Sequence, residues 1–265
     1  MGEVTGYPNG TFNWVDLGTP DVAGAKAFYS HLFGWTLVDV PAGGSRTYTV
    51  AQLQDMDVAA IHQHAEGEGE GKGAEWGSSI SVDHVDRTAS KARHLGATVL
   101  REPEDVMEAG RMALVRDPAG AVVSLWQPGT HMGARLVNEV GTWSWNELVT
   151  TELDAAKAFY SDLFGWTAED VPAGIPRTSF SMGDLLIGGA HAPTPQEGDG
   201  SRWTVSFLVA DAHDSAGRVG QLGGRVLLPP TDIPIGTFSI VSDAAGAAFT
   251  IAAVPGGAFR GLDGS

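Results

Sequence analysis

The sequence contains no cysteine, which excludes disulfide bonds, thiolate metal ligands and a cysteine nucleophile. Basic residues are also scarce, with 16 Lys and Arg against 32 Asp and Glu, and the formal net charge is −16 at pH 7. This charge would repel a polyanion, so we expect no nucleic acid and no membrane surface as a partner. No apolar run approaches the ~20 residues that span a bilayer, and the N-terminus lacks the pattern of a secretory signal. These absences predict a soluble, cytoplasmic protein.

Several catalytic motifs are missing as well. The sequence shows no Ser/His/Asp triad, no glycine-rich phosphate loop, no dinucleotide-binding fingerprint and no His-Glu-x-x-His helix. Its 265 residues correspond to about two domains on a prior of roughly 150 residues each.

The chain repeats itself. The segment 21–35 returns as 152–166, and both copies end in Phe-Tyr-Ser-x-Leu-Phe-Gly-Trp. The segment Asp117-Pro-Ala-Gly-Ala121 returns as Asp243-Ala-Ala-Gly-Ala247. We therefore predict two duplicated domains, residues 8–130 and 139–256, joined near 128–139, with an acidic, glycine-rich connector at 66–73 inside the first.

Each domain is predicted to contain the order βαβββ twice. In the first module, alternation over 12–17 predicts a strand, and the helical spacing of Ala25, Phe28, Tyr29 and Leu32 predicts a helix that ends at Gly34. Three strands are predicted to follow at 36–40, 47–53 and 58–63. The second module is predicted to have a strand at 78–82, a helix at 86–95, and strands near 98–101, 111–116 and 121–126.

This pattern resembles the vicinal oxygen chelate superfamily, which includes glyoxalase I, bleomycin- and fosfomycin-resistance proteins and extradiol dioxygenases. The resemblance rests on Pro20-Asp21 before the first helix, on the repeated helix end, on Leu95-Gly-Ala97 and on Asp117-Pro-Ala-Gly-Ala121. It covers residues 10–255 in two copies, and the chain looks most like tandem glyoxalase-like proteins, some of which carry the label hydroxylase. The resemblance implies an α+β fold in which four βαβββ modules form two open, barrel-like cups.

The resemblance also implies where a metal would bind. In the metal-dependent members, His, Gln or Glu side chains from the first and last strands of paired modules hold one divalent cation. Carried over to this chain, those positions fall at or near Trp14, Ala60, Gly77 and Ser124, and at Trp145, Gly189, Thr204 and Thr250. Indole rings, hydroxyl groups and hydrogen atoms are not usual ligands. We therefore predict that the family metal site is missing in both halves, and we expect no cofactor.

A relocated metal site is the alternative. His62 and His191 are equivalent in the repeat, and period-two alternation places them on the strand faces of the missing ligands. Asp16 and Glu147 would add inward carboxylates, and His64 a further imidazole. Equally, these histidines would lie at a strand end beside a solvated loop without binding anything.

The inward carboxylates of Asp16 and Glu147 need partners, because a buried carboxylate without one is costly. One interpretation is a structural pairing with Arg111, Arg46 or Arg177. The other is functional: these carboxylates recognise a cationic or hydroxyl-bearing ligand, or act as general bases, which makes them the candidate catalytic residues.

The leading functional hypothesis is a metal-free protein that binds a small organic molecule in a Trp- and carboxylate-lined cup. Its predicted ligand-binding residues are Trp14, Asp16, His62, Ser124, Trp126, Trp145, Glu147, His191 and Thr250. Because the counterpart of Trp126 is Ala252, the two cups are expected to differ in volume. The alternatives are a glyoxalase-type lyase or isomerase, or an oxygenase, with relocated metal ligands, and a metal-free enzyme with a carboxylate base. The duplication predicts a monomer that forms an internal pseudo-dimer, or a weak homodimer.

Overall fold

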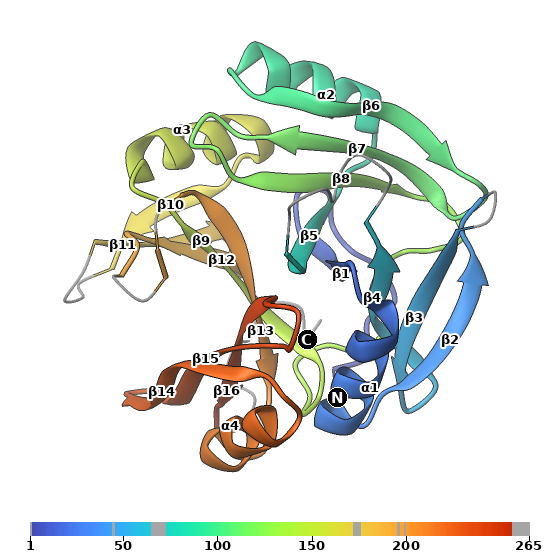
Figure 1. Cartoon of the computed structure of the whole chain (residues 1–265). Coiled ribbons are helices and arrows are strands. Elements are labelled where there is room, and N and C mark those ends of the chain that lie inside the picture. Colours follow the sequence, from blue (N-terminus) through green and yellow to red (C-terminus); the bar gives the residue numbers. More distant parts are fainter. Residues whose placement is uncertain are drawn as a thin grey trace.

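The computed structural model describes residues 2–43, 46–64, 73–171, 176–194, 197–198 and 200–255. The N-terminal half forms one eight-stranded sheet in the order β2-β3-β4-β1-β5-β8-β7-β6 (Figure 1). Its strands are β1 (Phe12–Thr19), β2 (Thr36–Pro41), β3 (Thr47–Leu53), β4 (Met56–Gln63), β5 (Glu75–Ser81), β6 (Thr98–Val106), β7 (Gly110–Arg116) and β8 (Val122–Pro128). Its helices are α1 (Val22–Phe33) and α2 (Val85–His94).

The C-terminal half repeats this design in the order β10-β11-β12-β9-β13-β16-β15-β14. Its strands are β9 (Trp143–Val149), β10 (Thr167–Asp170), β11 (Arg177–Met182), β12 (Leu185–His191), β13 (Arg202–Leu208), β14 (Arg225–Ile233), β15 (Gly236–Ser242) and β16 (Ala248–Ala253). Its helices are α3 (Leu153–Phe164) and α4 (Ala212–Gln221). The predicted α+β fold with four βαβββ modules is thereby confirmed. The predicted domain boundaries stay predictions; residue 256 and the connector at 66–73, apart from Gly73, lie outside the described residues.

Local chemistry sets the bounds of α1. The side chain of Asp21 accepts a hydrogen bond from the Gly24 amide and caps the first turn, and Gly34 ends the helix with a left-handed φ of 77°. Ala25, Phe28, Tyr29 and Leu32 are buried along one face, as their spacing predicts.

The structure extends one predicted strand. The prediction ended β6 at Arg101, where the sequence becomes charged and contains Pro103, but the strand continues to Val106. Because β6 lies at the edge of its sheet, charged side chains and a proline are tolerated there.

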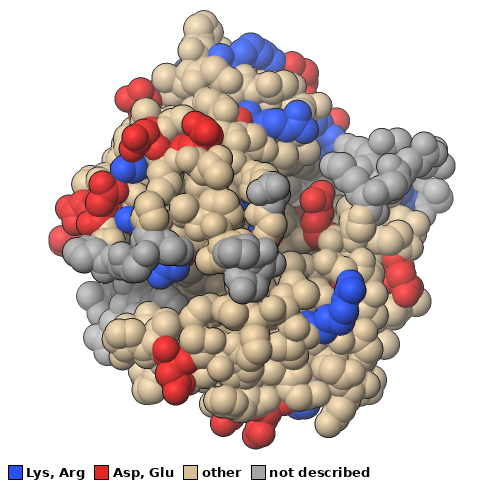
Figure 2. Space-filling model, turned by 60° about the vertical axis from the view of Figure 1, so that its left-hand side comes forward, with Lys and Arg blue, Asp and Glu red and all other residues tan. Residues whose placement is uncertain are grey.

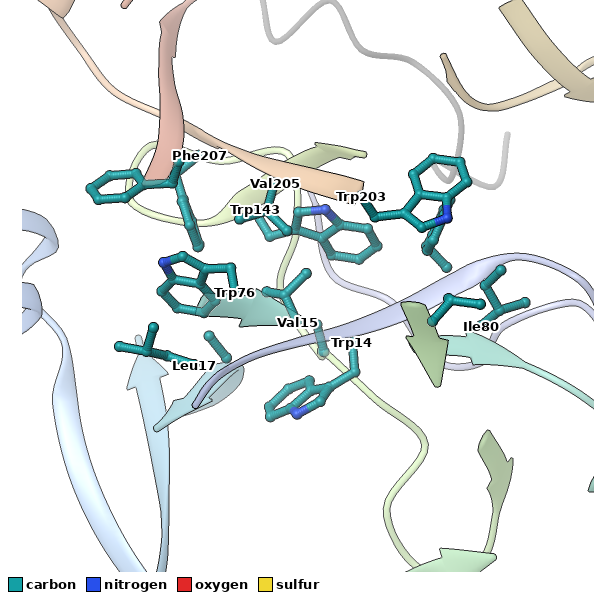
Figure 3. Packing of buried hydrophobic residues seen from close by; sticks show 14 of the residues in the cluster. Trp14, Val15, Leu17, Trp76, Ile80, Trp143, Trp203, Val205 and Phe207 are labelled. Atoms are coloured by element: carbon teal, nitrogen blue, oxygen red, sulfur yellow. The ribbon is translucent and has the colours of Figure 1, made fainter. Parts of the chain in front are cut away.

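Each half is built around an antiparallel pair that joins its two modules: β1 with β5, and β9 with β13. Side chains alternate along these strands. In Figure 3, Val15 of β1 points toward Val205 of the C-terminal sheet, whereas Trp14 points away from it on the other side. One face of each curved sheet therefore packs in the core between the halves, and the other face is turned away from it.

The core between the halves is aromatic. The ring of Phe33 lies 5.0 Å from that of Phe207, and the ring of Trp76 lies 5.0 Å from Phe207 as well. The tryptophans that follow α1 and α3 form hydrogen bonds that hold the two halves together. The Trp35 indole donates to the Gly141 carbonyl, and the Trp166 indole donates to the Gly10 carbonyl. The chain is therefore an internal pseudo-dimer, and Trp35 and Trp166 are buried where its halves meet.

Within the described part of the chain, no helix is long and apolar enough to cross a membrane. The Lys and Arg side chains described on the face shown in Figure 2 lie in small separate groups among acidic residues.

Candidate functional site

Four side chains form a hydrogen-bonded network on the outward face of the N-terminal sheet. The Trp14 indole Nε1–H donates to the Tyr48 hydroxyl over 2.7 Å, and that hydroxyl donates to Asp16 Oδ2 over 3.1 Å. The His62 ring stacks on Tyr48 with centroids 5.8 Å apart, and its Nε2 lies 3.6 Å from Asp16 Oδ2. The Asp16 and His62 side chains remain 29% and 32% exposed, so a small molecule can reach them. We call this face, with these four residues and Ser124 and Trp126, the N-terminal cup.

Strand register brings the network together. Asp16 of β1 lies between Ala60 of β4 and Gly77 of β5, two small residues that leave room for its carboxylate. A Cβ atom at position 77 would lie 2.9 Å from Asp16 Oδ1, closer than real contacts allow. In the β3–β4 hairpin, Tyr48 lies directly opposite His62.

The protonation of the network follows from its geometry. Burial, then the nearby Asp16 carboxylate, raise the pKa of Tyr48 well above its usual value, so the phenol keeps its proton and donates it to Asp16. His62 Nδ1 lies 3.1 Å from the Gln63 carbonyl oxygen, which assigns a proton to Nδ1. Nε2 and Asp16 Oδ2 then face each other as two acceptors, so a hydrogen-bond donor from a ligand would fit between them.

A residue from the connection between the halves lies against this cup. The ring of His131 lies 4.6 Å from that of Trp14 and 5.9 Å from that of Trp126, edge to face in both cases. Its backbone is held by the Trp126 indole, which donates to the His131 carbonyl over 2.9 Å. Burial lowers the pKa of His131, against the opposing effect of Asp57 and Asp16, so the ring is neutral near pH 7. Its Nε2 is enclosed without a hydrogen-bond partner among the described residues.

The C-terminal half holds a different set on the equivalent face. The Trp145 indole donates to Glu147 Oε2, and Arg177 Nη2 lies 3.5 Å from Glu147 Oε1. At the end of β12, His191 Nε2 lies 3.4 Å from Glu197 Oε1, and both of these side chains are only 8% exposed. We call this face, with Trp145, Glu147, Arg177, Ser179, His191, Thr204, Ser206 and Thr250, the C-terminal cup.

The structure brings some of the predicted site residues together and places others apart. It brings His62 to Asp16, as a relocated pair requires, but it places His191 beside Glu197 rather than Glu147. Ser124 and Thr250 lie on β8 and β16, opposite Ser79 and Ser206. His64 contacts the Gly73 carbonyl at 3.2 Å, apart from the carboxylate.

The predicted pairing of Glu147 with an arginine is confirmed for Arg177, whereas that of Asp16 with Arg111 is wrong. Arg111 binds Asp86 and Asp105, because β7 aims its side chain at α2 and the neighbouring edge strand. Tyr48 and the imidazole of His62 contact Asp16 instead.

Three site residues were not found from the sequence. Tyr48 lies opposite His62 only because a bulge shifts the hairpin register. His131 and Glu197 lie in irregular segments, where periodicity carries no information. Only the alternation of Tyr48, Val50 and Gln52 along β3 gives a usable signal.

These residues do not fit the divalent cation of the metal-dependent relatives. The described residues contain no group of three or more His, Cys, Asp or Glu side chains that would hold a metal ion. The indoles of Trp14 and Trp145 donate hydrogen bonds and offer no lone pair to a cation. We therefore derive no step through a metal.

Comparison with known proteins identifies similar sequences along both halves. Residues 11–125 and 142–251 match the model of the Glyoxalase/Bleomycin resistance protein/Dioxygenase superfamily. The chain is 42% identical over 249 residues to "Putative glyoxylase CFP32" of Mycobacterium tuberculosis, covering 92% of this chain and 95% of that protein. It is 32% identical over 260 residues to "Anthracycline biosynthesis protein DnrV" of Streptomyces peucetius, covering 94% of each.

Solved structures share the fold at low identity. The Mn(II)-bound glyoxalase from Novosphingobium aromaticivorans matches with a TM-score of 0.62 at 17% identity, covering 96% of this chain and 83% of that one. The 2,3-dioxygenase LapB from Pseudomonas sp. KL28 matches with a TM-score of 0.63 at 14% identity, covering 96% and 93%. At such low sequence identity, these similarities show only that the folds are alike.

Proposed function

The chain belongs to the glyoxalase/bleomycin resistance protein/dioxygenase superfamily, and from this premise we propose that it binds a small, flat organic molecule in the N-terminal cup. The observation that carries the proposal is the network of Trp14, Tyr48, Asp16 and His62, in which fixed aromatic rings border a partly exposed carboxylate and imidazole. Ligand sites commonly combine apolar and aromatic walls with a few placed polar groups.

Two features support an aromatic ligand. The half-buried rings of Tyr48 and Trp126 offer surface for stacking, the buried Trp14 indole holds the Tyr48 hydroxyl in place, and Asp16 accepts hydrogen bonds from a ligand hydroxyl. One relative is named for anthracycline biosynthesis, and anthracyclines are polycyclic aromatic compounds that carry hydroxyl groups. A hydroxylated polycyclic aromatic is thus the ligand class that we propose.

The test is isothermal titration calorimetry with a dihydroxyanthraquinone as the probe. Wild-type protein is expected to bind it, and Asp16→Asn to bind about tenfold more weakly, because a hydrogen bond to a charged acceptor is lost. Glu147→Gln is the matched control in the other cup and should bind as the wild type does. Absence of binding to folded wild-type protein, or equal weakening by both variants, contradicts the proposal.

A metal-free acid–base enzyme is the second candidate, because His62 Nε2 and Asp16 Oδ2 lie 3.6 Å apart on partly exposed side chains and could both reach one reacting group. The base would remove a proton from the carbon next to a ketone. The C–H electron pair would form the C=C bond of an enolate while the carbonyl π pair moves to oxygen, and return of a proton to the same carbon would regenerate the ketone.

Hydrogen–deuterium exchange of dihydroxyacetone in D₂O, followed by NMR, tests this candidate. Enzyme-dependent loss of the carbon-bound proton signal that disappears in Asp16→Asn would support it. Exchange at the rate of buffer alone would leave binding as the function.

A further inference from the structure

The two cups differ in chemistry although they descend from one repeat. Strand register makes Tyr48 equivalent to Arg177, since each lies opposite the histidine at the end of the next strand, and Gly77 equivalent to Thr204, opposite the carboxylate. The C-terminal cup therefore has a guanidinium in place of the Tyr48 phenol, and hydroxyl groups in place of the Val50 side chain and the Gly77 hydrogen atom. It also has Ala252 in place of Trp126.

The hydroxyl groups of the C-terminal cup share one face with Glu147. Thr204 of β13 lies directly opposite Glu147, and Ser179 lies opposite Gly189, which is itself opposite Glu147. Ser206 follows two residues after Thr204 and pairs with Thr250 of β16, so the row from Ser179 to Thr250 crosses five strands. The Thr204 hydroxyl donates to the Glu147 carbonyl over 3.0 Å.

Most of these hydroxyl groups are still able to form hydrogen bonds with a ligand. Ser179, Ser206 and Thr250 make no side-chain hydrogen bond within the described part of the chain, and none of their oxygens is among its enclosed, unpartnered atoms. Each hydroxyl offers one donor and two acceptor lone pairs.

Glu147 supplies an independent sign of a missing partner. Its Oε1 is buried and accepts no hydrogen bond from any described residue, and the nearest cation, Arg177 Nη2, lies 3.5 Å away. A buried carboxylate oxygen without a donor costs free energy, which a hydroxyl inserted beside it would recover. The Arg177 side chain is 43% exposed, so it can shift to admit that hydroxyl and donate to it.

We propose that the C-terminal cup is a second binding site, specific for a polyhydroxylated ring such as a sugar or cyclitol. Alternating donors and acceptors along such a ring match the row of hydroxyl groups, and two adjacent hydroxyls reach Glu147 and Arg177. The Trp145 indole N–H is held by its hydrogen bond to Glu147 Oε2, so it lies beside the carboxylate that the ring would bind. This site is independent of whatever the N-terminal cup binds.

The test follows the indole N–H signals of Trp145 and Trp14 by ¹H–¹⁵N NMR during titration with glucose, mannose and myo-inositol. Trp145→Phe and Trp14→Phe variants assign the two signals. At least one of the three probes is expected to shift the Trp145 signal in a saturable way without shifting that of Trp14. Cyclohexanol, a ring of the same size with one hydroxyl, should leave both signals in place.

Variants separate the two sites. Glu147→Gln should weaken the binding of the polyol about tenfold, and Ser179→Val, which installs the residue that the other cup has at the equivalent position 50, should weaken it as well because a hydroxyl is lost. Asp16→Asn is the matched control and should leave polyol binding unchanged. If none of the three probes shifts Trp145 in folded protein, if cyclohexanol acts equally, or if Asp16→Asn and Glu147→Gln act alike, the proposal is wrong. None of these outcomes bears on the anthraquinone titration of the N-terminal cup.

Discussion

Tyr29 of the N-terminal half donates a buried hydrogen bond to Asp243 of the C-terminal half, over 3.1 Å and across 214 residues of sequence. The Trp76 indole donates to the same hydroxyl over 3.0 Å. The repeat produces the reciprocal contact, in which Tyr160 binds Asp117 over 2.8 Å and accepts from the Trp203 indole. The Phe-Tyr motif on which the family resemblance rests thus serves to join the halves.

Removing one of these hydroxyl groups should destabilise the chain. Tyr29→Phe leaves the Trp76 indole and one Asp243 oxygen without a partner in the core, so we expect a loss of about 1–3 kcal/mol in the free energy of unfolding. Tyr160→Phe should cost a similar amount. Because the two contacts share no residue, the double variant should show nearly additive losses. Urea unfolding followed by circular dichroism measures all three, and a loss below ~0.5 kcal/mol for either single variant would contradict this role.

The same aspartates predict a pH dependence. Burial raises the pKa values of Asp117 and Asp243 above 3.8, although hydrogen bonds oppose the shift. Between 3.8 and the raised value, the folded chain holds more protons than the unfolded chain, so the free energy of unfolding falls as pH rises through this window. The stability of wild type relative to Asp243→Asn should therefore be greatest at the lowest pH and decline as pH rises. Urea unfolding of both proteins from about pH 3 to about pH 7 checks the sign.

His131 should show the opposite sign. Burial lowers its pKa below 6.5, so its contribution to stability is complete above that value and is lost as pH falls through the lowered pKa. An NMR titration of the histidine ring protons, with His131 assigned from His131→Gln, should show this ring titrating below 6.5. Asp57→Asn should lower the pKa further, because the Asp57 carboxylate raises it. A His131 pKa at or above 6.5 would show that the ring is not enclosed as described.

Two glycine substitutions should have opposite outcomes. In Gly77→Ala the new Cβ would lie 2.9 Å from Asp16 Oδ1 and push the carboxylate aside, so anthraquinone binding should weaken while the fold persists. In Gly217→Ala, on α4, the added methyl meets open space, and the chain should gain up to about 1 kcal/mol from helix propensity. Calorimetric titration and thermal unfolding of both variants separate the two effects. Unchanged binding in Gly77→Ala would mean that the position of Asp16 does not matter for the ligand.

Much of the fold could be predicted from the sequence, because its signals are local. The buried stripe of α1, its Asp21 cap and its Gly34 end all lie within one short segment, and the structure confirms each of them. The duplication then gave the second half without further assumptions.

The candidate site was harder to predict from the sequence, because it depends on the register between paired strands. The turn at Gln54 and Asp55 pairs Leu53 with Met56, and an unbroken ladder would set Tyr48 opposite Ile61. A bulge after Ala51 shifts the pairing by one residue, which brings Tyr48 to His62 and so to Asp16. No sequence pattern marks that bulge, and none fixes the path of the segment that carries His131.

The core between the halves limits how this chain can be divided. Trp76 and Phe207 come from different sheets yet bury each other. Either half produced alone would therefore expose a large hydrophobic, aromatic surface to water. Such a fragment would have to pair with another copy of itself or precipitate. Fusing the two repeats into one polypeptide keeps the matching surfaces at high local concentration, so the outward face of each sheet can change in sequence without loss of assembly.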